Sequence, residues 1–170
     1  MFALLLCIAV GIQPIITSSS NEKLAAITNI YPSARGINYK ATPDVAAEAR
    51  RITNGRGVDV VINSIGPASV MRDLDALRSK DGHVSLIGFL EGFSADWDPN
   101  AIMGFMSKRA SLRGTRVGPK SAFIKLNDFL EQNKISLSPI IDRVFPFAES
   151  QAACDYLYSG KHVGKVVITI

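Results

Sequence analysis

The chain alternates β-branched apolar segments with segments of helical spacing, and this alternation constrains the fold more than any other feature. The strongest strand signal is Val58–Ile62, a nearly continuous apolar run typical of a parallel strand covered on both faces. Apolar residues then recur at helical spacing at Val70, Leu74 and Leu77. Repetition of this unit predicts an α/β protein built on a doubly wound parallel sheet.

The same patterns divide the whole chain into expected elements. Strands are expected over residues 15–17, 36–39, 58–62, 84–87, 112–117, 140–145 and 166–170. Helices are expected over residues 19–30, 42–52, 70–77, 121–133 and 149–158. Ser19 with Glu22 predicts a capping box, and Thr42 before Pro43 predicts the N-cap of the next helix.

The first ten residues, MFALLLCIAV, allow two interpretations. Their apolar run resembles the core of a signal peptide, but no basic segment precedes it and it is too short to span a bilayer. Gly11, Pro14 and the apolar residues 15–17 favour a buried helix that ends at a glycine before a short buried strand. We therefore predict a helix here.

Composition and charge exclude several classes of protein. The chain has 170 residues, of which 47% are hydrophobic and 20% charged, so it can bury one substantial core. The net charge of +4 is spread along the chain, and the nearest approach to a cluster is Arg50, Arg51 and Arg56. No aromatic residues interleave with these arginines, so we interpret them as a solvated helix face and expect neither nucleic-acid nor membrane binding.

Cysteine and histidine are rare. Cys7 and Cys154 lie far apart in apolar, helical surroundings, which indicates buried free thiols of a reduced compartment and hence a cytoplasmic protein. His83 and His162 lack metal-ligand spacing to a cysteine or carboxylate. We expect no zinc site.

Ligands of parallel α/β sheets bind beyond the carboxyl ends of the strands. Hydroxyls at residues 17–20 and Lys23 follow the first expected strand, and they suit the 2′-phosphate of NADP where a carboxylate would suit NAD. The alternative is that Ser19 only caps a helix and Lys23 only solvates its face. Gly66 and Gly88 follow later strands, where glycine permits close approach of a ligand but also serves tight turns.

Several runs in chain order carry a family resemblance: ITSSSNEKL, GINY, GRGVDVVINSIGP, HVSLIGFLEG, LRGTRVG, PIIDRVFPF and HVGKVVITI. Together they resemble the cofactor-binding half of the medium-chain dehydrogenase/reductase superfamily, in particular zinc-type alcohol dehydrogenase-like proteins and NADPH quinone oxidoreductases. The resemblance implies a Rossmann-like dinucleotide-binding domain over residues 1–135. Residues 136–170 would be a strand-helix-strand return segment of the catalytic domain.

The resemblance also implies which residues bind the nicotinamide dinucleotide. The 2′-phosphate of NADP is assigned to Ser19, Ser20 and Lys23, with assistance from Tyr39. The nicotinamide side is assigned to Asn63, Gly66, Gly88, Phe89, Arg116, Gly118 and Lys165. No residue is implied as catalytic, and none as a metal ligand.

The sequence also departs from the family. Pro67 stands where relatives usually carry a second glycine, and the first strand, the glycine-rich turn and the upstream catalytic domain are missing. Because the first strand lies at the centre of such a sheet, two strands are expected to have unpaired edges. A second copy, another chain, residues 166–170 or direct contact between the flanking strands could cover these edges, or they stay open and cause aggregation.

The expected function is that of an NADP-binding part of an oxidoreductase whose intact relatives pass hydride between NADPH and a carbonyl, alcohol or activated alkene. NADP binding is expected to be weak or lost, and turnover by these residues alone is expected to be absent. Two alternatives remain open. One is a non-catalytic protein that retains nucleotide or partner binding, and the other is a truncated gene product.

Overall fold

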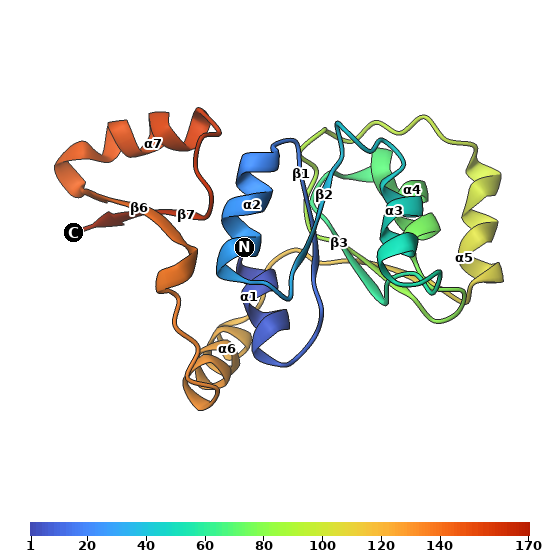
Figure 1. Ribbon diagram of the computed structural model, residues 1–170, viewed down its shortest axis with the longest axis horizontal. Helices are drawn as coiled ribbons and strands as arrows, with labels where there is room; N and C mark the ends of the chain where they lie inside the picture. Colours follow the sequence, from blue (N-terminus) through green and yellow to red (C-terminus); the bar gives the residue numbers. More distant parts are fainter. The chain divides into compact units, whose positions relative to one another are not determined.

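The computed structural model describes residues 1–170 and divides into two compact units. Unit 1 comprises Met1–Asn38 and Pro119–Ile170, and unit 2 comprises Tyr39–Gly118. All paired strands in both units run parallel, and helices connect them (Figure 1). The predicted α/β class with parallel sheets is therefore confirmed.

The N-terminal part of unit 1 consists of α1 (Phe2–Ala9), β1 (Ile15–Ser18), α2 (Asn21–Ile30) and β2 (Arg35–Asn38). β1 and β2 form a parallel pair against which α2 lies (Figure 1). Leu4 of α1, Ile27 of α2 and Ala34 form a buried apolar cluster, which also contacts Val163 near the C-terminus. This packing explains the apolar first residues and confirms the predicted helix.

The start of α2 differs by one residue from the prediction. The Ser18 hydroxyl accepts a hydrogen bond from the Ser20 amide at 3.2 Å, so the turn after β1 extends past Ser19. Ser20 is the N-cap, and its hydroxyl accepts from the Lys23 amide at 3.3 Å. The capping box predicted for Ser19 and Glu22 is therefore wrong.

The next helix, α3 (Val45–Ile52), also begins later than predicted. Its N-cap is Asp44, whose carboxylate accepts a hydrogen bond from the Ala47 amide at 2.8 Å. A carboxylate two residues after Thr42 satisfies the free amide of the first turn, so the prediction of Thr42 as N-cap is wrong.

The C-terminal part of unit 1 contains α6 (Lys120–Gln132), β6 (Ile141–Pro146), α7 (Ser150–Tyr158) and β7 (Lys165–Thr169). β6 and β7 pair in parallel and form a separate two-stranded sheet, with α7 between them in the chain (Figure 1). The predicted strand-helix-strand segment is confirmed. Because β7 pairs with β6 alone, it does not cover the edge of β1.

Unit 2 contains, after α3, the elements β3 (Val60–Asn63), α4 (Val70–Ala76), β4 (His83–Leu86), α5 (Met103–Ser107) and β5 (Ser111–Gly114). The strands form one parallel sheet in the order β3-β4-β5. Leu74, Leu77 and Val84 form its buried core, and Val61 packs against them. The core therefore lies between the sheet and α4.

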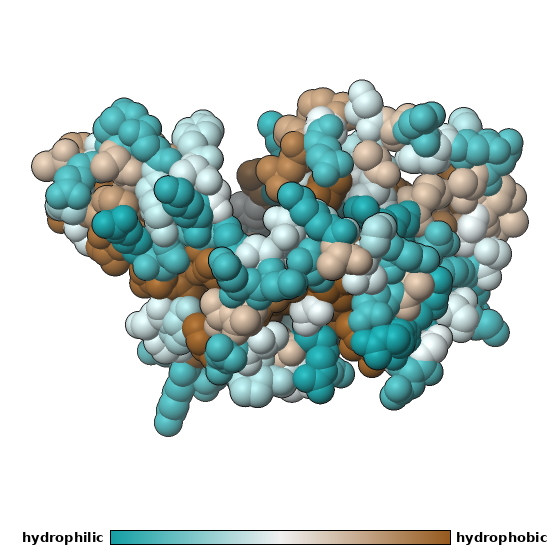
Figure 2. Space-filling view, turned by 45° about the horizontal axis from the view of Figure 1, so that its top comes forward, coloured by the Kyte–Doolittle hydropathy of each residue, from teal (hydrophilic) through white to brown (hydrophobic).

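β3 is an edge strand, and only one of its faces is covered by a helix of unit 2. Val60 and Ile62 are 54% and 49% exposed, so the prediction that this strand is covered on both faces is wrong. α4 packs against one face of the strand, through Val61, and the other face, with Val60 and Ile62, is left uncovered within unit 2. Hydrophobic residues also appear among polar ones on the molecular surface in Figure 2. β1 pairs only with β2, and β3 only with β4, which confirms the two unpaired strand edges.

Both cysteines are free, as predicted. Cys7 is half-buried, because α1 buries only part of its surface. Cys154 is exposed on α7, so the prediction that it is buried is wrong. The cause is that α7 buries only Ala153 within unit 1.

Candidate functional site

Two of the predicted phosphate ligands lie where β1 ends and α2 begins, in unit 1. Ser19 is exposed and its side chain makes no hydrogen bond within the protein, whereas the Ser20 hydroxyl is used as the helix cap. The free backbone amides of the first turn of α2 point out of the N-terminal end of the helix. Together with the helix dipole they favour the binding of an anion there. This end of β1 therefore offers a free hydroxyl and a favourable dipole.

Lys23 makes contacts that its sequence position did not predict. Its ammonium donates to the carbonyl oxygen of Gly160 and, at 3.0 Å, to that of His162. Both carbonyls belong to the segment between α7 and β7, so the alternative that Lys23 only solvates a helix face is wrong. An ammonium has three N–H donors, and these contacts leave one for another partner.

In unit 2, the loops that follow β3 and β4 are bound to each other. The amides of Leu90 and Glu91 donate to the carbonyls of Ser64 and Ile65, each at 3.0 Å. Gly66 has φ = 117°, and a β-carbon there would lie 2.8 Å from the Gly92 carbonyl oxygen. Glycine is required here because the two loops approach closely, which accounts for its presence without a ligand.

Next to these loops lies a polar cluster of the buried residues Asn63 and Ser69 and the half-buried Asp73. The Asn63 amide nitrogen donates to the Asp73 carboxylate at 2.6 Å and to the Ser69 hydroxyl at 2.9 Å, while its oxygen accepts from the Gly66 amide at 2.8 Å. Asn63 is only 2% exposed, so its side chain serves the protein interior. Burial raises the pKa of the Asp73 carboxyl, although hydrogen bonds from Ser69 and Asn63 oppose the shift.

The structure brings only some of the predicted nicotinamide-side residues together. Asn63 and Gly66 are hydrogen-bonded, and Gly66 lies against Phe89, whose ring stacks on Phe93 with centroids 4.5 Å apart. A β-carbon on Gly88 would meet the Ser64 carbonyl oxygen at 3.0 Å, so Gly88 belongs to the same pair of loops.

The remaining predicted residues lie apart from that group. Tyr39 directly follows β2 and is exposed. Arg116 and Gly118 are exposed in the segment after β5, and Lys165 is exposed at the start of β7. None of these four forms a hydrogen bond or ion pair with the predicted ligands described above, so their roles stay predictions.

Ser69 and Asp73 were not anticipated from the sequence. A signal was available, because Asp73 follows Val70 by one helical turn and precedes Leu74, and both neighbours are buried. An acidic residue placed on the apolar face of a short helix needs a polar partner, and Asn63 at the end of β3 provides it.

No group of three or more histidine, cysteine or acidic side chains is placed to hold a metal ion. None of the helices combines the length and apolar character needed to cross a membrane.

Comparisons with known proteins bear on nearly the whole chain. Residues 34–168 match a family model described as zinc-binding dehydrogenase. A zinc-type alcohol dehydrogenase-like protein of Schizosaccharomyces pombe is 36% identical over 170 residues, covering 99% of this chain and 48% of that protein. A 2-haloacrylate reductase of a Burkholderia species is 28% identical over 162 residues, covering 91% of this chain and 47% of that protein.

A solved structure is likewise similar to nearly the whole of this chain. A protein of Sinorhizobium meliloti 1021 assigned as an alcohol dehydrogenase matches with a TM-score of 0.85 and 31% identity, over 99% of this chain and 47% of that one. The chain thus spans about half the length of the relatives it matches.

Proposed function

The chain belongs to the zinc-binding dehydrogenase family of the medium-chain dehydrogenase/reductase superfamily, and we propose that its residues form the NADP-binding part of an oxidoreductase. One observation carries the choice of cofactor. Ser19 and Lys23 stand at the carboxyl end of β1, and residues 17–20 hold no carboxylate that would bind the ribose diol of NAD. When bound, the dinucleotide would supply the hydride.

In this proposal the 2′-phosphate lies against the first turn of α2. The free hydroxyl of Ser19 and the remaining N–H of Lys23 would donate to phosphate oxygens, and Tyr39 would assist. The Ser20 side chain, already used as the cap, would contribute only by fixing the helix start. The contacts of Lys23 with the Gly160 and His162 carbonyls support the proposal, because they restrict the ammonium to this region.

The nicotinamide side would be formed by the paired loops after β3 and β4. Gly66 and Gly88 would allow the backbone of these loops to approach the cofactor, and Phe89 would offer an apolar ring. Asn63 would hold the loop in place by its hydrogen bond with the Gly66 amide. The exposed residues Arg116 and Gly118 would complete this side within unit 2, and the role that the resemblance implies for Lys165 of unit 1 stays a prediction.

We propose further that these residues alone do not turn over substrate. The sequence contains no glycine-rich turn to hold the pyrophosphate, so affinity should be weak. Hydride transfer also requires that nicotinamide and substrate carbons are held close and aligned. Nothing in the described site identifies a general acid.

Titration with NADPH and NADH tests the cofactor assignment. We expect weak binding that favours NADPH, loss of that preference in Lys23→Glu, and retention in Lys23→Arg. Lys125→Glu on α6 is the matched control, because it makes the same charge change at an exposed site. Thermal melting of each variant separates loss of binding from loss of the contacts to Gly160. Equal binding of NADH and NADPH would refute the assignment.

Turnover and metal content need separate measurements. NADPH oxidation with aldehydes, enones and quinones should not exceed the uncatalysed rate, and saturable turnover of about 1 per second would contradict this proposal. Elemental analysis after dialysis should find no stoichiometric zinc, and about one zinc per chain would contradict that expectation.

A further inference from the structure

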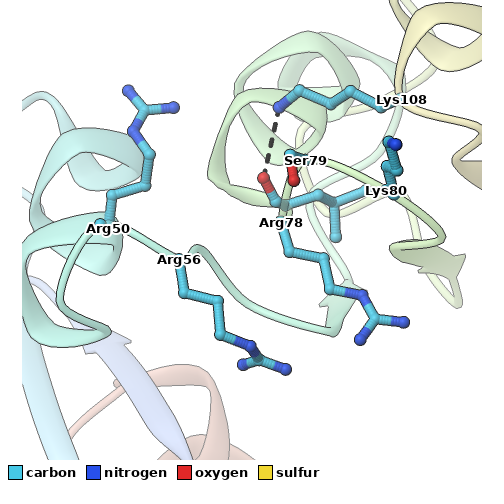
Figure 3. Close-up of a pocket in the computed structure, with 8 residues that line it drawn as sticks. Arg50, Arg56, Arg78, Ser79, Lys80 and Lys108 are labelled. Atoms are coloured by element: carbon cyan, nitrogen blue, oxygen red, sulfur yellow. Dashed lines mark hydrogen bonds between the residues drawn. The ribbon is translucent and has the colours of Figure 1, made fainter.

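Unit 2 has a hollow of about 400 Å³ whose lining is strongly basic. We call it the basic hollow, and its polar lining consists of Arg50, Arg56, Arg78, Ser79, Lys80 and Lys108. Arg50 and Arg56 lie on one side of it, and the other four residues lie opposite (Figure 3). Five cationic side chains from separate segments of the chain therefore surround one space.

The basic hollow lies at the amino ends of the strands. Arg56 precedes β3, Lys80 precedes β4 and Lys108 precedes β5. Because the three strands are parallel, these segments meet at one end of the sheet, and the loops containing Gly66 and Gly88 meet at the other. The basic hollow is thus separate from the predicted cofactor loops of this unit.

Acidic side chains neutralise the basic hollow only in part. Asp59 pairs with Arg56 and, at 2.8 Å, with Arg78. One carboxylate is thereby shared between two guanidinium groups. Asp59 and Arg56 are exposed and Arg78 is partly exposed, so the pairing is readily exchanged for another anion.

Two further cations interact with the end of α4. Lys108 donates to the carbonyls of Leu74 at 2.7 Å and Leu77 at 3.3 Å, and Arg50 donates to the carbonyl of Asp75. These contacts satisfy free carbonyls of the last helical turn, and they hold both cations at the rim.

The remaining donors have no partner within the protein. Lys80 and Ser79 are exposed and make no hydrogen bond or ion pair. The Nε–H group of Arg78 is buried and has no acceptor. A buried donor without an acceptor is unfavourable, and an anion in the basic hollow would provide one.

We propose that the basic hollow binds a small molecule that carries two or more phosphoryl groups. Guanidinium and ammonium donors match phosphoryl oxygens. Cations on opposite sides, together with a volume in the range of small-molecule sites, suit an anion larger than a single phosphate. The lining contains no aromatic ring on which a nucleobase could stack, which argues against a single-stranded nucleic acid.

Calorimetric titration of the full chain with inorganic phosphate, pyrophosphate and tripolyphosphate at low ionic strength tests this proposal. Affinity should rise with the number of phosphoryl groups, saturate at one ligand per chain and fall with added salt. Lys80→Glu should weaken tripolyphosphate binding by about tenfold or more, because it replaces a free donor with a negative charge. Lys80→Ala should have a smaller effect in the same direction.

A control variant locates the effect. Lys125→Glu carries the same charge change outside unit 2 and should alter affinity by less than about twofold. Equal weakening by Lys80→Glu and Lys125→Glu would overturn the proposal. Tighter binding of a single-stranded oligonucleotide than of tripolyphosphate would also overturn it.

Discussion

The two ends of the β3-β4-β5 sheet are formed by the same three strands, yet they use polar groups in opposite ways. At the carboxyl end, Asn63 and Asp73 satisfy each other inside the protein, and glycines allow the loops to meet. At the amino end, cations gather around a hollow and several donors stay unpaired. At the carboxyl end, close packing pairs the polar groups with one another. At the amino end, the open hollow leaves cationic side chains available to bind a ligand.

The acidic residues report the same contrast. Burial raises the pKa of Asp73 at the carboxyl end, whereas the hydrogen bond from Arg56 lowers the pKa of Asp59 at the amino end. Desolvation disfavours a carboxylate, and a neighbouring guanidinium stabilises it. The two ends should therefore respond in opposite directions to acid, which gives the comparison a measurable form.

Replacing Gly66 by alanine should have the largest effect. The substitution places a side chain at φ = 117° with its β-carbon 2.8 Å from a backbone carbonyl, so the free energy of unfolding should fall by about 3 kcal/mol. Gly92→Ala is the matched control, since φ is 87° there but nothing lies within 4 Å. Urea denaturation should show a loss of only about 1 kcal/mol for the control. Equal losses would mean that the loops do not pack as described.

Removing the amide of Asn63 should have the next largest effect. Asn63→Ala leaves the Gly66 amide without its side-chain acceptor and the half-buried Asp73 carboxylate with only the Ser69 hydroxyl, and this should cost about 2 kcal/mol of unfolding free energy. Asn100→Ala, in an exposed turn of the same unit, is the control and should cost less than half as much. A near-neutral Asn63→Ala would show that the cluster does not stabilise this end of the sheet.

Asp73→Asn should have a smaller effect whose size depends on pH. The folded protein holds the Asp73 proton more tightly than the unfolded chain, so this carboxyl costs stability once the pH rises through its folded pKa. The asparagine variant should thus be more stable than the parent at neutral pH, and the gain should disappear in acid. Denaturation at several pH values measures this, with Asp128→Asn on exposed α6 as the control. A gain that is constant with pH would contradict the raised pKa.

Much of the fold could be predicted from the sequence because the necessary information is local. Helical spacing at Val70 and Leu74, and β-branched runs such as the one that contains β3, identify elements without knowledge of their neighbours. Helix starts were less certain, because Ser19 and Ser20 are both suitable caps. The choice between them depends on where the turn after β1 ends, which the Ser18 hydroxyl decides.

The properties that sequence reasoning missed depend on residues far apart in the chain. The exposure of Val60 arises because no helix of unit 2 covers its face of β3, and a continuous apolar run cannot reveal this. The sequence suggests a solvated helix face for Arg56, because Arg78 and Lys108, the other cations that line the basic hollow with it, come from later segments. The predicted site shows the same limit, since the contact of Lys23 with the Gly160 carbonyl joins opposite ends of the chain.

Asp59→Asn should have the smallest effect on stability and should sharpen the comparison at the amino end. Asp59 is exposed, so removing its charge should change the unfolding free energy by about 0.5 kcal/mol or less. The lowered pKa of Asp59 contributes stability that is lost as pH falls through the folded pKa, and the variant should lack this loss in acid. Since the substitution releases two guanidinium groups into the basic hollow, tripolyphosphate should bind about threefold more tightly. Asp96→Asn, an exposed acidic residue of the same unit, should leave that affinity unchanged, and equal gains in both variants would show that net charge alone attracts the anion.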